Sequence, residues 1–167
     1  MGSWELMIDV LVAGVLATTL MDAWSALLRR IGVATLDYAL VGRWLGHMLH
    51  GQWRHAAITR AAPVRYERLT GWVAHYLLGI GYVAGLVAVT GPEWLLHPSL
   101  AVALAFGLLS MVVPWCVLQP ALGAGFFASR TPRPWHARVQ TVASHSVFGM
   151  GMYLGACCWQ SLSAWAG

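Results

Sequence analysis

Three ionisable side chains stand inside apolar stretches of this sequence. Asp22, His75 and His145 are each surrounded by runs rich in Leu, Val, Ala and Gly. An Asp near the centre of a membrane helix costs about 2.5–3.5 kcal/mol on insertion scales, so such residues usually face a bundle interior and a partner. A carboxylate and two imidazoles can relay protons, bind a polar ligand or ligate a transition metal. These residues are therefore the candidate site.

The three residues are expected at one depth in the membrane. Each lies seven residues from an arginine: Asp22 before Arg29, His75 after Arg68, and His145 after Arg138. A helix rises 1.5 Å per residue, which places each side chain roughly 10 Å inside the same edge. We expect the three to meet in one layer. Arg43, His47 and Glu67 are predicted at its cytoplasmic mouth, and Cys116 or Gln119 could add a fourth group.

Several functions fit these residue types. The three could form a proton relay or substrate site in a small transporter. His75 and His145 could bind a transition metal with Asp22 as a ligand or orienting group, or serve as the axial ligands of a haem. They could also be a polar cluster that only fixes helix register in a structural subunit. No Gly-x-Ser-x-Gly, Walker, Rossmann or Cys-x-x-Cys motif occurs, so the motifs leave open whether the chain is an enzyme.

The composition indicates what must position these residues. The 167 residues are 59% hydrophobic and 10% charged, with a mean hydropathy of +0.64. Average soluble domains are about 45–50% apolar and about 25% charged. This excess excludes an ordinary soluble enzyme and a disordered chain. The net charge of +4 comes from arginines confined to two loops, which argues against nucleic acid as a partner. We expect an all-α, polytopic protein whose partner is the lipid bilayer.

Four stretches reach the roughly 20 residues that a membrane-crossing helix needs. They are about Leu6–Leu28, Leu69–Thr90, Ser99–Gln119 and Val139–Ala164, in a single transmembrane domain over residues 1–167. All ten arginines lie in the loops 29–68 and 120–138 between them. The positive-inside rule makes these loops cytoplasmic and puts both termini outside the inner membrane of a bacterium.

The first loop is predicted to hold a short amphipathic helix at the interface. Arg43, His47, His50 and Arg54 recur at helical spacing, opposite a face that carries tryptophan and leucine. This helix could be an interfacial anchor. Alternatively, it could be a cap whose Arg and His side chains contact an anionic ligand or a lipid phosphate.

A glycine pattern recurs 70 residues apart. His75 begins a His-x-x-x-Gly-x-Gly-x-x-x-Gly pattern that ends at Gly85, and His145 begins the same pattern, which ends at Gly155. We expect a four-helix bundle built from two similar helical hairpins. Because four short helices enclose little volume, a transporter of this size is expected to form a homodimer.

Several motifs resemble a family of small bacterial membrane proteins, the domain of unknown function 2938. They are Met21-Asp22, Gly42 to His47, Glu67 with Gly71-Trp72, His75-Tyr76, Gln119-Pro120, Gly123, Gly125, Ala128-Ser129, Thr131-Pro132, and His145 with Phe148-Gly149. The resemblance covers nearly the whole chain. It implies a compact four-helix membrane protein and carries over no activity and no catalytic residue.

Overall fold

The computed structural model describes residues 2–166, and side chains as far as residue 161. This part of the chain is all-helical and contains no strand. Its elements are α1 (Ser3–Arg30), α2 (Tyr38–Met48), η1 (Ile58–Arg60), α3 (Glu67–Thr90), α4 (Glu93–Leu96), α5 (Leu100–Leu109), η2 (Pro114–Leu118), α6 (Gln119–Leu122), η3 (Phe126–Ala128) and α7 (Pro134–Ala166).

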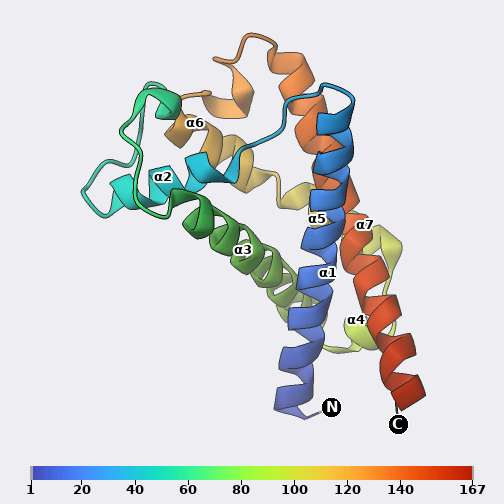
Figure 1. The fold of residues 1–167 in the computed structure, drawn as a ribbon. Coiled ribbons are helices and arrows are strands. Elements are labelled where there is room, and N and C mark those ends of the chain that lie inside the picture. Colours follow the sequence, from blue (N-terminus) through green and yellow to red (C-terminus); the bar gives the residue numbers. More distant parts are fainter. Residues whose placement is uncertain (1, 167) are drawn as a thin grey trace.

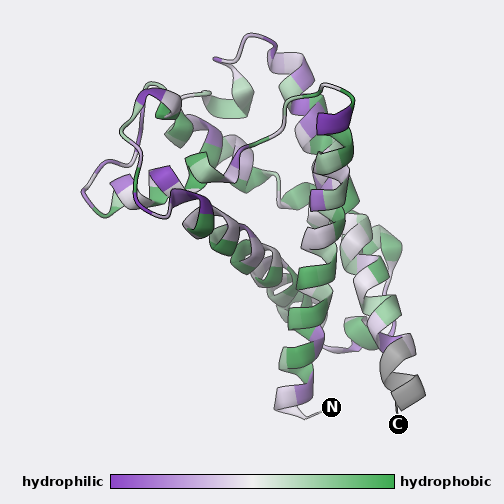
Figure 2. Cartoon of the chain, in the orientation of Figure 1, coloured by the Kyte–Doolittle hydropathy of each residue, from purple (hydrophilic) through white to green (hydrophobic). Residues whose placement is uncertain are grey.

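The long helices separate an arginine-rich end from the end that holds the termini. α1 and α7 lie side by side, whereas α3 leaves them at an angle towards α2 (Figure 1). Both chain ends and α4 lie at one end of the molecule, and the two long loops lie at the other (Figure 1). Hydrophobic residues predominate along α1 and α3, and hydrophilic residues gather in the loops (Figure 2).

Three helical stretches are long and apolar enough to cross a membrane. They are Ser3–Arg30, Glu67–Thr90 and Leu100–Leu122, which contain the first two predicted spans and most of the third. The predicted fourth span, Val139–Ala164, lies within α7, whose described part does not meet the same standard. Since α7 packs against both α1 and α5, its polar residues need not face lipid. The structure therefore supports three such helices, and the four-span bundle stays a prediction.

The third predicted span is not one continuous helix, which corrects the sequence interpretation. α5 stops at Leu109, and a π-helical segment, η2, begins at Pro114. Because proline has no backbone N–H, it cannot donate to the carbonyl of Ser110 four residues earlier. The backbone N–H of Val113 and the Tyr82 hydroxyl donate to that carbonyl, each at 3.2 Å. The break thus turns Ser110 towards the interior of the molecule.

The predicted interfacial helix is shorter than expected. Asp37 caps α2 by accepting a hydrogen bond from the backbone N–H of Ala39 at 2.9 Å, and the helix ends at Met48. The predicted face was therefore wrong at two of its four positions, because His50 and Arg54 lie beyond the helix.

Glycines bring α2 directly onto α3. A Cβ at Gly42 would collide with the carbonyl of Glu67, and one at Gly71 would collide with the carbonyl of Tyr38. Small residues allow two helix backbones to approach this closely. The crossing fixes Tyr38, at the start of α2, over the first turns of α3.

Candidate ligand site between two histidines

The first half of the site is an acid–imidazole pair that joins α1 to α3. His75 Nε2 lies 3.0 Å from Asp22 Oδ1, and the Tyr76 hydroxyl donates to Asp22 Oδ2 at 3.0 Å. The His75 and Asp22 side chains are 13% and 16% exposed. The carboxylate therefore has two hydrogen-bond donors from the protein. These bonds offset the free-energy cost of burying a charged group. The sequence analysis expected the helices that carry Asp22 and His75 to meet at these two residues, and the observed pair agrees with that expectation.

Aromatic rings hold the His75 imidazole in place. The Tyr38 ring stacks on it with centroids 4.0 Å apart and planes inclined by 23°, and Trp72 approaches it edge-on. Burial and the nearby Asp22 carboxylate raise the pKa of the Tyr38 phenol, so this group stays protonated at neutral pH. Its hydroxyl has no hydrogen-bond partner among the described residues. It is therefore available to donate to a ligand.

The second half of the site joins His145 to Ser110 and contains no carboxylate. Ser110 Oγ donates to the Gly107 carbonyl at 2.6 Å and lies 2.6 Å from His145 Nδ1. Since the single hydroxyl proton goes to the carbonyl, Nδ1 of His145 must donate to Ser110 Oγ. The other ring nitrogen, Nε2, is then an unprotonated acceptor. The helix break after Leu109 thus sets the tautomer of a histidine 35 residues later.

Both histidines line one cavity. This inner cavity measures about 110 Å³ and is otherwise mostly apolar, with Thr18, Tyr38 and Tyr82 as further polar lining residues. An outer cavity of about 340 Å³ adjoins it and reaches the second loop at Thr131. The two cavities share the lining residues Met21, Leu36, Tyr38, Pro114, Leu118 and His145. The two cavities therefore adjoin, and of the Asp22–His75 pair it is His75 that lines the inner one.

The outer cavity contains an unsatisfied polar atom. Oε1 of Gln119 is buried and has no hydrogen-bond partner among the described residues. Gln119 lines this cavity, as does Ser144. Buried acceptors are normally paired with protein or water, so this atom can accept a hydrogen bond from water or from a ligand in the cavity. Gln119 was one of the two residues that the sequence suggested as a fourth group.

The three predicted residues do not form a single cluster. Asp22 pairs with His75, whereas His145 bonds to Ser110. The described residues contain no group of three His, Cys, Asp or Glu side chains that could hold a metal ion. The assignment of His75, His145 and Asp22 to a metal therefore stays a prediction, with two of its three ligands in contact.

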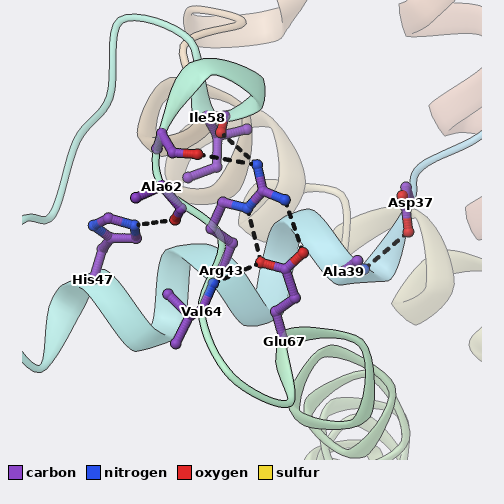
Figure 3. Close-up of polar contacts among 9 residues, drawn as sticks. Asp37, Ala39, Arg43, His47, Ile58, Ala62, Val64 and Glu67 are labelled. Carbon is purple, nitrogen blue, oxygen red and sulfur yellow. Dashed lines mark hydrogen bonds and ion pairs between the residues drawn. The ribbon is translucent and has the colours of Figure 1, made fainter.

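Arg43 and Glu67 form a clasp that ties α2 to the start of α3 (Figure 3). Arg43 Nη2 and Nε donate to the two carboxylate oxygens of Glu67 at 2.7 and 2.8 Å. Arg43 Nη1 donates to the carbonyls of Ile58 and Ala61, and Glu67 accepts from the backbone N–H of Val64. Hydrogen bonding to Glu67 raises the pKa of Arg43. All three guanidinium nitrogens thus bind protein.

His47 belongs to the same end of α2. Its Nε2 lies 2.9 Å from the carbonyl of Ala62 (Figure 3), and its Nδ1 lies 2.8 Å from Gln52 Oε1. These partners hold the first loop against α2, and both ring nitrogens are in use. The placement of Arg43, His47 and Glu67 at the mouth of a ligand site stays a prediction. Their observed contacts are structural.

Two residues of the site were missed by the sequence analysis. Tyr38 had no signal, because its position over His75 comes from the Gly42–Gly71 crossing. Ser110 did have one, since Pro114 stands four residues after it in a run assigned to one helix. A proline at that spacing marks a broken hydrogen-bond ladder.

Comparison with known proteins gives a family without an activity. Residues 11–159 match the family model described as protein of unknown function (DUF2938). No curated protein matches the chain, and no solved structure matches it.

Proposed function

We propose that this chain, which belongs to the DUF2938 family and inherits no activity from it, is a small membrane protein that binds and handles a small ligand. The ligand would enter from the arginine-rich end and reach the Asp22–His75 pair, as in a small transporter of a bacterial inner membrane. The observation that carries the proposal is the single inner cavity lined by histidines from two different helices.

Cavity size supports a small ligand with an apolar body. Ligand pockets usually measure about 300–1,000 Å³. The outer cavity, at about 340 Å³, is at the lower end of that range, and the inner one, at about 110 Å³, would hold only a small group. We therefore place the body of the ligand in the outer cavity and its polar end near the two histidines.

The polar groups suggest a ligand that carries both a donor and an acceptor. The Tyr38 hydroxyl is a free donor, and Nε2 of His145 is a free acceptor. Gln119 Oε1 is a further acceptor on the outer wall. A carboxylic acid or an amide could use this set.

The Asp22–His75 pair adds a place to exchange a proton. A carboxyl and an imidazole 3.0 Å apart can share one proton, and the pair stays neutral overall whether that proton lies on oxygen or nitrogen. A ligand that brings or takes a proton would change the charge of the pair. In a low-dielectric interior such a change is costly and must be compensated, which is the basis of proton-linked transport.

Cysteine labelling tests whether the cavity is open to water. Ser144 lines the outer cavity and lies six residues after Arg138; Val73 is 49% exposed on the outside of α3 and lies five residues after Arg68. We would introduce Ser144→Cys or Val73→Cys after replacing Cys116, Cys157 and Cys158. Vesicles of both orientations would then be treated with a membrane-impermeant maleimide.

We expect Ser144→Cys to react from the arginine-rich side only and Val73→Cys to react from neither side. A thiol must ionise to react, and lipid suppresses ionisation. Because Val73 is at a similar depth, depth alone cannot produce this result. An unreactive Ser144→Cys, or equal labelling at the two positions, would contradict an open cavity.

A further inference from the structure

A third cavity lies outside the proposed ligand path, between the two arginine-rich loops. It measures about 330 Å³, and its lining includes Arg54 and His55 from the first loop and Gly125, Ser129 and Arg130 from the second. The loops are joined here by a hydrogen bond from the backbone N–H of His55 to the carbonyl of Ala121, at 2.9 Å. The cavity therefore exists only because two segments distant in sequence meet. We call it the arginine pocket.

The charge of the arginine pocket is entirely positive. Neither Arg54 nor Arg130 has a side-chain hydrogen bond or ion pair among the described residues. Residues 50–66 and 119–138 contain no Asp or Glu. The remaining arginines with acidic or carbonyl partners are elsewhere: Arg43 binds Glu67, and Arg138 donates to the carbonyl of Phe127. Arg54 and Arg130 are exposed, so water screens their mutual repulsion, and an anion in the pocket would be attracted by both guanidinium groups.

His55 supplies an independent sign of a missing partner. Both of its ring nitrogens are buried and lack a hydrogen-bond partner in the described chain. Its ring meets the ring of His47 edge-on at 5.0 Å, but the nitrogens of His47 are already bonded to Gln52 and Ala62. A neutral imidazole always carries one N–H, and a buried donor without an acceptor costs about 1–3 kcal/mol. An acceptor in the pocket would remove that cost.

The backbone around the pocket is held in unusual conformations. Gly123 and Gly125 have φ values of +98° and +74°, and Phe127 and Ala128 have φ values of +51° and +57°. A Cβ at Gly125 would lie 2.5 Å from Ser129 Oγ, so only glycine lets the Ser129 hydroxyl come this close. Strained left-handed residues persist where the surrounding structure enforces them, often at binding sites.

We propose that the arginine pocket binds a phosphate group, held by Arg54 and Arg130 with the Ser129 hydroxyl and the His55 ring as further donors. Arginine is the preferred residue for phosphate because its planar group donates two parallel hydrogen bonds. The phosphate belongs either to a lipid headgroup or to a soluble phosphate compound. Exposed aromatic residues beside the pocket, Trp53 (60%) and Phe126 (50%), would lie at headgroup depth if the site binds lipid.

The test compares two pairs of arginine substitutions in the full-length protein. Arg54→Gln with Arg130→Gln removes the pocket charges. Arg60→Gln with Arg133→Gln removes the same number of charges, one from each loop, at exposed positions outside the pocket lining. The thermal unfolding midpoint of each purified protein in a neutral detergent would be titrated with phosphatidylglycerol, phosphatidylcholine or inorganic phosphate at constant ionic strength.

We expect phosphatidylglycerol to stabilise the wild type and the Arg60/Arg133 pair equally, and the Arg54/Arg130 pair at least about tenfold more weakly in apparent Kd, equivalent to about 1.4 kcal/mol. Phosphatidylcholine should bind more weakly, because its choline offsets the phosphate charge. If inorganic phosphate gives the same separation, the ligand is a soluble phosphate. The proposal is overturned if no titrant distinguishes the two pairs, or if both pairs weaken equally, which would indicate general charge attraction.

Discussion

The two halves of this molecule use the same sequence pattern for different chemistry. In the first half, His75 shares a charged hydrogen-bond network with Asp22 and Tyr76. In the second half, His145 lies 2.6 Å from a serine hydroxyl at a helix break and has no carboxylate partner among the described residues. Both histidines nevertheless line the same cavity. The repeated histidine therefore occupies a similar place beside the cavity in both halves. The residues that pack against it determine which hydrogen bonds it makes.

The glycines of the two patterns also differ in use. In α7, Gly149 packs against Ala103 of α5, and Gly151 packs against Ala17 of α1. In α3, Gly79 packs against Thr18 of α1, whereas nothing lies within 4 Å of a Cβ at Gly81. The middle glycine of the pattern is thus enclosed in α7, at Gly151, and open in α3, at Gly81. Similarity of pattern is not evidence of similar packing.

Replacing each histidine in turn should give the largest difference between the halves. His75→Ala leaves Asp22 without its imidazole partner, and breaking a buried pair costs about 3–5 kcal/mol. His145→Ala leaves Ser110 still bonded to Gly107, so we expect a loss of only about 1 kcal/mol from the hydrogen bond. Unfolding in a detergent titration would measure both.

A second substitution checks the cause of this difference. Adding Asp22→Ala to His75→Ala should recover part of the lost stability, because it removes the unpaired carboxylate. Equal losses from the two single variants, with no recovery in the double variant, would show that the two halves are chemically alike.

Glycine-to-alanine changes at matched positions should differ in sign. A Cβ at Gly151 would lie 2.8 Å from the Cα of Ala17, so Gly151→Ala should destabilise by about 1–3 kcal/mol through overpacking. Gly81→Ala should leave stability unchanged or raise it by up to about 1 kcal/mol, because alanine is the better helix former. The same titration measures both, and a loss at Gly81 as large as that at Gly151 would contradict the open surroundings of Gly81.

Replacing an arginine by lysine should have a larger effect on the first arginine-rich loop than on the second. Arg43→Lys keeps the charge but loses the two-point contact with Glu67, so we expect a loss of about 1–2 kcal/mol and faster proteolysis of residues 49–66. Arg138→Lys replaces a single bond to an exposed carbonyl and should cost less than about 0.5 kcal/mol. Identical proteolysis of both variants would show that the clasp does not order the first loop.

The smallest expected effect concerns a shared metal. Because His75 and His145 have separate protein partners, elemental analysis should find the same transition-metal content in the wild type, His75→Ala and His145→Ala. A stoichiometric metal in the wild type that both substitutions remove would mean that one ion joins the halves. That result would mean that His75 and His145 have the same role, as ligands of one metal ion, and that the two halves do not differ as described.

Sequence reasoning succeeded where one helix and its hydrophobic pattern decide the outcome. Of the four membrane-crossing stretches that the apolar runs predicted, three coincide with helices long and apolar enough to cross a membrane. The resemblance predicted the family, which the match over residues 11–159 confirms. The cost of burying Asp22 predicted a partner on another helix, and His75 is that partner. These conclusions follow from the length of an apolar run and from the free-energy cost of placing a charge in an apolar medium.

The errors came from long-range packing and from backbone breaks. The extended face from Arg43 to Arg54 required a longer helix, but α2 ends at Met48. The third span was assigned as one helix because hydropathy does not register the missing N–H of Pro114. The convergence of His145 with Asp22 stays a prediction: His145 lines the same cavity as His75, but its hydrogen-bond partner is Ser110.

The sequence alone determined which side chains could not remain unpaired in an apolar medium, and at which end of the molecule the arginines gather. These properties follow from composition and spacing along the chain. Only the tertiary structure decided which partner each histidine has, since that depends on the Gly42–Gly71 crossing and the helix break at Ser110. It also placed Arg54 beside Arg130, because loops separated by more than 60 residues meet only after the helices pack.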